Sequence, residues 1–164
     1  SGTFAPISHA GQVYTFESVN AFRTGLEASV KTTKGGWSAS ADGSLLGQWD
    51  VETGLGLPFT TPAQLHTVIG RNLSQNHHLT VSCRAIADAT LTARNEAPTE
   101  GALLWGLGWS LARRVGTWSI NLHNASNTAW LDHTSAYRAL GLVAQGRWMQ
   151  LSFTTSVKQS NKNR

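Results

Sequence analysis

Large apolar residues alternate with small or polar ones along residues 103–123, the most regular stretch of the chain. The large side chains form two runs, first Trp105, Leu107, Trp109 and Leu111, and then Trp118, Ile120 and Leu122. A period of two is the mark of strands with one apolar face. If residues 113–116 form a loop, every large side chain of the first run falls opposite one of the second on the same face. The pattern predicts a long antiparallel hairpin, with Trp109 and Ile120 as buried cross-strand neighbours.

Weaker alternation indicates further strands on both sides of this hairpin. In residues 37–49, a two-residue Asp42-Gly43 turn would set Trp37 against Gln48. A three-residue loop that also includes Ser44 sets Trp37 opposite Trp49 and aligns the apolar faces, so we expect that register. Other predicted strands cover residues 13–19, 79–93 with a bend near 85–87, and a last hairpin about Gln145-Gly146 that pairs Leu142 with Met149.

One segment has helical rather than strand spacing. Thr61 is a suitable N-cap and Pro62 a suitable first helical residue. The apolar residues that follow at helical spacing are Leu65, Val68, Ile69 and Leu73. This predicts one short helix within residues 61–73. Residues 19–30 fit a helix or a strand, and both alternatives stay open.

These elements predict a mainly all-β fold of about eight strands with one short inserted helix. An antiparallel sheet of this size must pack on a second sheet or close, so a sandwich, a jelly-roll-like fold or a closed barrel is expected. Residues 1–157 are predicted to form a single domain, with an arm over about residues 1–12, followed by a basic polar tail at 158–164.

The composition suggests surface hidden in contacts between subunits. Hydrophobic residues make up 40% of the 164 and charged ones only 13%, which is about half the usual share. There are seven tryptophans, of which five fall on the predicted apolar faces and are assigned to the core. Trp130 and Trp148 do not share that pattern, and we assign them to a subunit interface.

Basic residues gather in the last third of the chain. Residues 101–164 hold seven Lys or Arg against Asp132 alone, within a net charge of +4 for the whole chain. Such asymmetry suits contact with phosphates. The predicted contacts with nucleic acid are Arg138, Arg147, Lys158, Lys162 and Arg164.

No arrangement of residues indicates catalysis, a metal or a cofactor. Cys83 shares its predicted strand face with apolar residues and is expected to be a small core residue. His77 and His78 point to opposite sides of a strand, and no ligand spacing connects His123, Asp132 and His133 to a known metal motif. We therefore expect a protein that is not an enzyme and has no cofactor and no metal.

A single cysteine and the lack of a signal peptide or a long apolar run argue against secretion and against a membrane partner. Together the features are typical of a self-assembling structural subunit like a small capsid protein, with RNA or DNA and further copies of itself as partners and a virion or the cytoplasm as its location. One alternative is a soluble ligand-binding or lectin-like β-barrel. A second alternative is an outer-membrane β-barrel, in which the Trp/Leu face meets lipid and the Gly/Ser face lines the lumen.

Overall fold

The computed structural model describes residues 2–6, 12–16, 18–94 and 96–155 of the chain. Almost all regular structure is β-strand, with one short 3₁₀ helix. The elements are β1 (Gly2–Pro6), β2 (Gln12–Phe16), β3 (Ala21–Lys34), β4 (Trp37–Asp50), β5 (Ala63–Asn72), β6 (His77–Ile86), β7 (Ala102–Arg113), β8 (Gly116–His123), η1 (Ala136–Leu140) and β9 (Trp148–Thr154).

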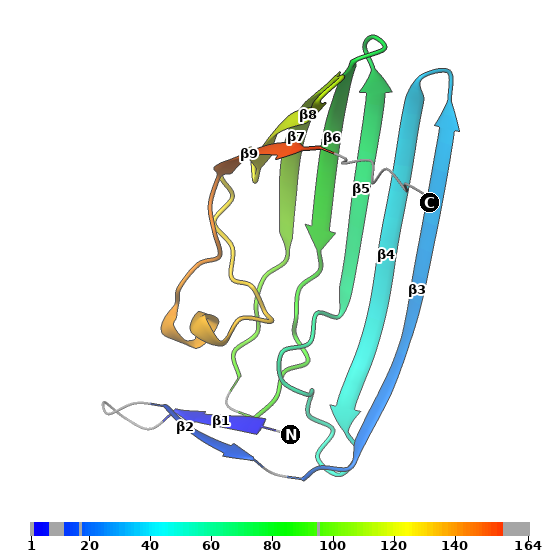
Figure 1. The fold of residues 1–164 in the computed structure, drawn as a ribbon. Helices are drawn as coiled ribbons and strands as arrows, with labels where there is room; N and C mark the ends of the chain where they lie inside the picture. The colour runs from blue at the N-terminus through cyan, green and yellow to red at the C-terminus, as the bar shows by residue number, and fades with distance from the viewer. Residues whose placement is uncertain (1, 7–11, 17, 95, 156–164) are drawn as a thin grey trace, which may run out of the picture.

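Strands β3 to β9 form one antiparallel sheet of seven strands in which each strand pairs with the next along the chain. This meander has two different ends (Figure 1). At one end, which we call the turn end, the strands are joined through residues 35–36, 73–76 and 114–115. At the other, the loop end, the connections are the much longer segments 51–62, 87–101 and 124–147. β1 and β2 pair with each other in a separate two-stranded sheet.

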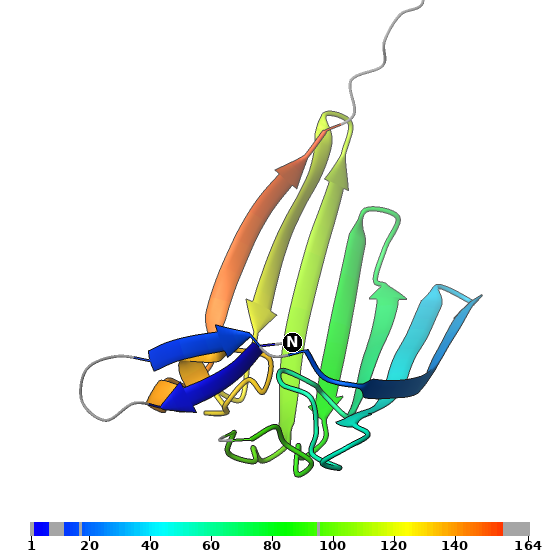
Figure 2. The same cartoon turned by 90° about the horizontal axis from the view of Figure 1, so that it is seen from below.

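The seven-stranded sheet is strongly curved but is not closed, because β3 and β9 each pair with one neighbour among the described strands (Figure 2). The other sheet among the described residues has two strands, β1 and β2. The predicted sandwich or jelly roll and the eight strands are therefore not confirmed, whereas the antiparallel all-β prediction is confirmed.

The register of the predicted central hairpin is confirmed. β7 and β8 pair Trp109 with Ile120, Leu107 with Leu122 and Leu111 with Trp118. The connection is tighter than expected, because Arg113 already pairs with Gly116. The predicted burial is wrong, since Ile120 is 38% exposed and Trp109 is only half-buried.

The predicted helix over residues 61–73 is wrong, because Ala63–Asn72 forms the inner strand β5. β5 hydrogen-bonds to β4 on one side and to β6 on the other. Leu65 and Ile69 suit a helical stripe and also one face of a strand, and β-branched Thr67, Val68 and Ile69 favour the strand. For residues 19–30, a helix and a strand were both left as alternatives. Residues 21–30 of this segment lie in strand β3.

The predicted turn at Asp42-Gly43 is also wrong, since β4 runs without interruption through these residues. The chain instead turns at Gly35-Gly36, where φ is 56° and 80° and Lys34 pairs with Trp37. Two successive residues with positive φ form the tight hairpin turn that glycine makes without strain.

The predicted last hairpin about Gln145-Gly146 does not form. Leu142 follows the 3₁₀ helix η1, and β9 pairs with β8 instead, with Met149 opposite Leu122. The predicted bend near residue 85 is the end of β6 at Ile86. The segment that follows returns by a single bridge between Ala89 and Thr99.

Candidate functional site

The two faces of the seven-stranded sheet differ in chemistry. Side chains alternate between the faces along each strand, and the pairing of the strands carries this alternation across the sheet. One side, which we call the apolar face, carries the large hydrophobic residues. It includes Phe22, Leu26, Val30, Trp37, Leu45, Trp49, Leu65, Ile69, Leu79, Val81, Trp105, Leu107, Trp109, Trp118, Ile120, Leu122, Met149, Leu151 and Phe153.

The apolar face is uncovered. Leu26 is 64% exposed, Leu107 48% and Trp37 47%, and these residues lie on an outer and two inner strands of the sheet. The only buried hydrophobic residues in the described part of the chain are Ala89 and Ala93, both in a loop. A monomer in water rarely exposes so large a continuous apolar surface. The five tryptophans assigned to a core therefore share a face, as predicted, but no core covers that face.

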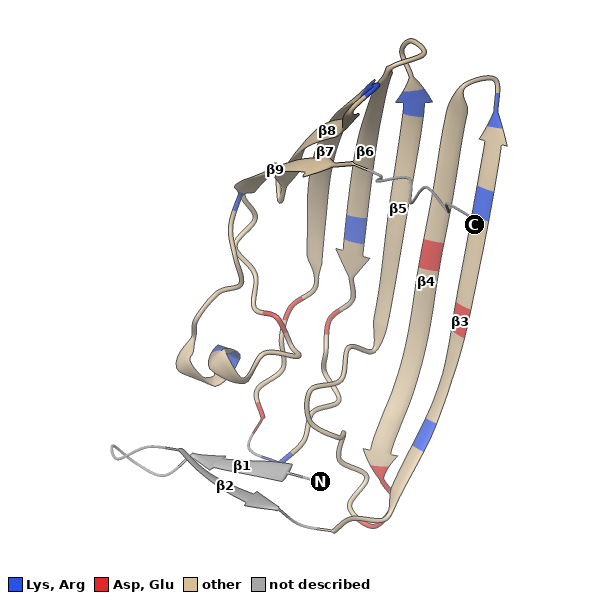
Figure 3. Cartoon of the chain, in the orientation of Figure 1, with Lys and Arg blue, Asp and Glu red and all other residues tan. Residues whose placement is uncertain are grey.

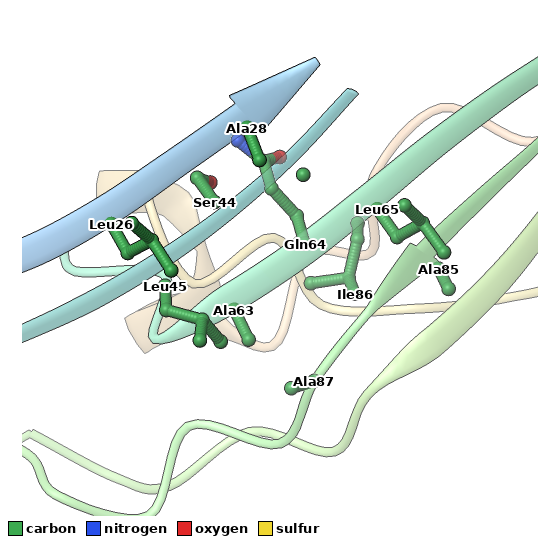
Figure 4. Close-up of a pocket in the computed structure, with 11 residues that line it drawn as sticks. Leu26, Ala28, Ser44, Leu45, Ala63, Gln64, Leu65, Ala85, Ile86 and Ala87 are labelled. Atoms are coloured by element: carbon green, nitrogen blue, oxygen red, sulfur yellow. The ribbon is translucent and has the colours of Figure 1, made fainter. Parts of the chain in front are cut away.

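Part of the apolar face is hollowed beside the loop end. A depression of about 450 Å³ lies where small side chains, Ala28, Ala63 and Ala85, stand between Leu26, Leu45 and Leu65 (Figure 4). Its lining is almost entirely apolar, with the side chains of β3 to β6 around it. Such a surface fits a flexible hydrocarbon chain better than a polar ligand.

The aromatic residues of the apolar face lie mostly near the strand ends. Phe22 and Trp49 contact each other at the loop end, with ring centroids 4.9 Å apart. At the turn end, Trp118 contacts Phe153 with centroids 4.6 Å apart. Trp37 lies at the start of β4, also at the turn end. Leu26, Val30 and Leu45 occupy the stretch of β3 and β4 between these aromatic groups.

Figure 3 shows where the charged residues lie along the strands, and by register most of them belong to the opposite side of the sheet, the polar face. A depression of about 680 Å³ on β3 to β6 is lined by Glu27, Asp42, His66 and Arg84 together with small and polar residues. Asp42, His66 and Arg84 are register partners on successive strands. The Arg84 guanidinium donates a hydrogen bond of 3.0 Å from Nη2 to Oε1 of Gln64. This face offers charged and hydrogen-bonding groups to water or to a polar solute.

Side chains crowd together on the polar face. A methyl group at Gly108 would come 2.3 Å from Thr80 Oγ1 and 2.7 Å from Asn121 Oδ1. Gly106 and Gly108 are buried, although Leu107 between them is exposed on the other side. Small residues are therefore required at these two positions by the side chains of the neighbouring strands.

A buried polar cluster ties the long loops together at the loop end. The Glu96 carboxylate accepts hydrogen bonds from the backbone N–H groups of Phe59 (3.2 Å) and Ala93 (2.9 Å) and forms an ion pair with Arg138. The side chains of Glu96 and Arg138 are each only 8% exposed. The Arg138 guanidinium also lies over the Phe59 ring, 5.7 Å from its centroid. One carboxylate thus joins the segments 51–62, 87–101 and 124–147.

His133 completes this cluster and is 3% exposed. Its Nδ1 lies 3.1 Å from Thr99 Oγ1 and in hydrogen-bond contact with Arg138, which can only donate. Burial lowers the pKa of His133 below its ordinary value, and the nearby Asp132 carboxylate only partly opposes this. Burial likewise lowers the pKa of Arg138.

The residues predicted as nucleic-acid contacts do not form one surface in the described chain. Arg138 is held in the ion pair with Glu96, and Arg147 is exposed at the loop end, where its backbone N–H donates to Asn127 Oδ1. Lys158, Lys162 and Arg164 lie outside the described residues.

The two tryptophans assigned to an interface are in different surroundings. Trp130 is half-buried in the segment between β8 and η1. Trp148 begins β9 and stacks on His123, with ring centroids 4.0 Å apart and ring planes 12° apart. Neither observation bears on whether these two residues contact another subunit.

The other residues considered for chemistry do not converge. Within the described residues, no group of three or more His, Cys, Asp or Glu side chains is arranged to hold a metal ion. Cys83 is half-buried on the apolar face, paired with Trp105 and Thr67. No helix in the described part of the chain has the length and apolar character needed to cross a bilayer.

Comparisons with known proteins bear on the fold. No protein-family model matches the chain, and no curated protein matches it. Among solved structures, the chain is similar to the copper transporter OprC, with a TM-score of 0.79 at 15% sequence identity. The similarity covers 93% of this chain but only 26% of the OprC chain. At this identity the similarity shows the fold, and the chain corresponds to about a quarter of the transporter.

These findings overturn the functional prediction. The self-assembling capsid-like subunit that binds RNA or DNA is wrong, and so are its placement in a virion or the cytoplasm and the exclusion of a membrane. OprC is a transporter, and strands β3 to β9 form a single sheet with an uncovered apolar face rather than one half of a sandwich. The physical reason is that low charge and abundant tryptophan indicate apolar surface without saying whether protein or lipid covers it.

Two groups of functional interest were missed by the sequence reasoning. Glu96 was not singled out, because its ion pair with Arg138 depends on how distant loops fold together. Lys34, Arg71 and Arg113 were not singled out, although each lies at a strand end beside a turn. Their position in the alternating pattern could have identified them once the strands were correctly assigned.

Proposed function

We propose that this chain forms part of the wall of a β-barrel that spans an outer membrane, with its apolar face against lipid and its polar face lining the lumen. The observation that carries the proposal is the uncovered apolar face, which extends over all seven strands of the sheet. In a soluble barrel the large apolar side chains would point inward and the polar ones outward. The crowding of side chains over Gly106 and Gly108 supports the reverse arrangement.

The lengths of the five strands β3 to β7 fit a bilayer, whereas β8 and β9, with 8 and 7 residues, are shorter. A tilted transmembrane strand needs about 9–11 residues. β5 and β6 have 10 residues each and β7 has 12, while β3 and β4 have 14 and extend further at the loop end. Aromatic residues near both ends of the apolar stretch agree with the aromatic girdles that such barrels place at the two interfaces.

The difference between the two ends of the sheet gives an orientation. Outer-membrane barrels have short periplasmic turns and longer extracellular loops. The turn end, with connections as short as residues 35–36 and 114–115, would then face the periplasm. The loop end, where Glu96 and Arg138 join the long segments, would face outward.

The open edges require further strands. An unpaired strand edge inside a bilayer leaves backbone N–H and C=O groups without partners, at a cost of several kcal/mol for each group (on the order of 4–8 for transfer to hydrocarbon). Within the described chain, β3 and β9 each have one unpaired side. We infer that additional strands complete the barrel beyond these two edges.

The proposed role is non-enzymatic passage of a polar solute along the polar face. Glu27, Asp42, His66 and Arg84 place both signs of charge on the wall. The similarity to a copper transporter favours transport. It does not identify the transported solute, because no group of side chains suited to a metal ion is present among the described residues.

Tryptophan fluorescence tests this proposal. The chain is refolded into phosphatidylcholine vesicles with or without bromine on the acyl chains, since bromine quenches tryptophans that contact lipid. We expect strong quenching, which should diminish in the Trp105→Phe variant, because Trp105 is on the apolar face of an inner strand. Trp130→Phe is the matched control, because Trp130 lies in the loop region, and it should leave the amount of quenched emission unchanged. Equal emission in both kinds of vesicle would refute the proposal.

A further inference from the structure

Charges are segregated along the strand direction. The described residues 28–41, 65–86, 102–123 and 148–155, which make up the turn end and the stretches of strand leading to it, contain no Asp or Glu. Asp50, Glu52, Asp88, Glu96 and Glu100 instead lie at or beyond the opposite strand ends (Figure 3). Among the described residues of the turn end, all the Lys, Arg, Asp and Glu residues are basic, namely Lys31, Lys34, Arg71, Arg113 and Arg114.

Three of these basic residues lie on the apolar face. Lys34 is the register partner of Trp37, which in turn pairs with Arg71. Arg113 follows Trp109 and Leu111 on the same side of β7. No other Lys, Arg, Asp or Glu of the described strands occupies a position on the apolar face. All three are exposed, and each lies within the last two residues of its strand before a turn.

The surroundings of Arg71 show how a cation is accommodated there. Its guanidinium carbon lies 4.5 Å from the centroid of the Trp37 ring. The aromatic ring stabilises the cation on its face, while the aliphatic part of the arginine covers apolar surface. Trp118 and Phe153, near Arg113, form a second aromatic group at the same end. Tryptophan beside a basic residue at the edge of an apolar surface is the arrangement found at the level of lipid headgroups.

We propose that Lys34, Arg71 and Arg113 form a binding surface for the phosphate groups of anionic phospholipids in the leaflet at the turn end. This rests on the proposed membrane barrel and goes beyond it by naming a ligand and a leaflet. The three cations border the lipid-facing surface rather than the lumen, so the phosphate next to them belongs to a lipid headgroup. No carboxylate of the described turn end competes for them.

The proposal predicts a preference that depends on charge and on salt. A basic residue close to an anionic membrane surface contributes about 1 kcal/mol, which corresponds to about fivefold in binding for each charge at low ionic strength. The preference should weaken as the Debye length falls to about 3 Å in 1 M salt.

Selectivity between spin-labelled lipids tests this surface. The chain is reconstituted in phosphatidylcholine vesicles that contain either spin-labelled phosphatidylglycerol or spin-labelled phosphatidylcholine, and the immobilised fraction of each lipid is measured by EPR. We expect several-fold selectivity for phosphatidylglycerol at low salt, and its loss in the triple variant Lys34→Gln, Arg71→Gln, Arg113→Gln. Arg147→Gln is the matched control, because it removes one exposed cation from the loop end and should leave the selectivity intact.

The outcomes separate this inference from the barrel proposal. Quenching by brominated lipid, measured on the same samples, reports insertion. Insertion with equal immobilisation of both lipids would overturn the phosphate surface alone, whereas failure of the wild type to insert would overturn both. Selectivity that persists in the triple variant, or that inorganic phosphate abolishes at constant ionic strength, would also overturn the phospholipid assignment. If the triple variant does not insert, Lys34→Gln and Arg113→Gln are tested singly, because each retains the contact of Arg71 with Trp37.

Discussion

Glu96 and Arg138 show how a single buried ion pair can organise long loops. Glu96 is satisfied by two backbone N–H groups and by the guanidinium, so removal of the arginine would leave a buried carboxylate without its charge partner. Breaking a buried pair in this way costs far more than losing an exposed one.

We therefore expect Arg138→Met to destabilise the protein by about 3–5 kcal/mol. Arg147→Met is the control, because Arg147 is an exposed arginine whose side chain forms no described ion pair; its effect should stay within about 0.5 kcal/mol. Urea titration of both variants refolded in detergent micelles measures the difference. Similar midpoints for the two variants would contradict the role assigned to the ion pair.

The stability of the loop end should depend on pH through His133. Its pKa is lowered by burial from an ordinary value of 6.5, so the unfolded chain binds a proton that the folded chain resists. Stability should accordingly fall as the pH drops below 6.5 towards the folded-state pKa, and should not change on this account at higher pH. Protonation would also place a second positive charge beside Arg138, near Glu96 and Asp132.

Urea titrations between pH 7.5 and 5, compared with the variant His133→Gln, isolate this contribution from other titrating groups. The wild type should lose more stability than the variant over this interval. A variant that loses as much as the wild type would show that His133 does not carry the effect.

At the scale of the element, the hairpin of β7 and β8 was predictable because its large residues leave one consistent register. β5 was not, since Thr61-Pro62 resembles a helix start and Leu65 and Ile69 satisfy both periods. The deciding factor is that β4 and β6 both need a partner strand between them, which no local pattern reveals. The Asp42-Gly43 pair similarly imitates a turn inside a continuous strand.

The strands should tolerate a charge on one face only. Leu107→Lys places a cation at the middle of β7 on the apolar face, and we expect a loss of about 2–4 kcal/mol if that face meets the bilayer midplane. His66→Lys is the control, because His66 is exposed on the polar face between Asp42 and Arg84. Its effect should stay within about 0.5 kcal/mol. Refolding into vesicles followed by urea titration provides both values, and equal losses would contradict the assignment of the faces.

For the whole molecule, the alternation of large apolar and small or polar residues identified the apolar face correctly. It did not indicate what covers that face. Trp105, Trp109 and Trp118 were assigned to a core because soluble β proteins bury such residues against a second sheet. The proposed barrel accounts for the exposure of Trp105 and Trp118 on a single curved sheet, with lipid as the covering phase. Of the candidate site residues, only positions within correctly assigned strands could be placed on a face from the sequence.

Access of spin labels to two relaxing agents tests the membrane-spanning arrangement most directly. The single cysteine, Cys83, is on the apolar face of β6, and His66→Cys in a Cys83→Ser background places a label on the polar face of β5. In vesicles, we predict that the label at Cys83 responds to oxygen, which dissolves in lipid, and hardly to a water-soluble nickel complex. The label at position 66 should show the opposite preference. Strong access of the nickel complex to Cys83, equal to that at position 66, would contradict the account.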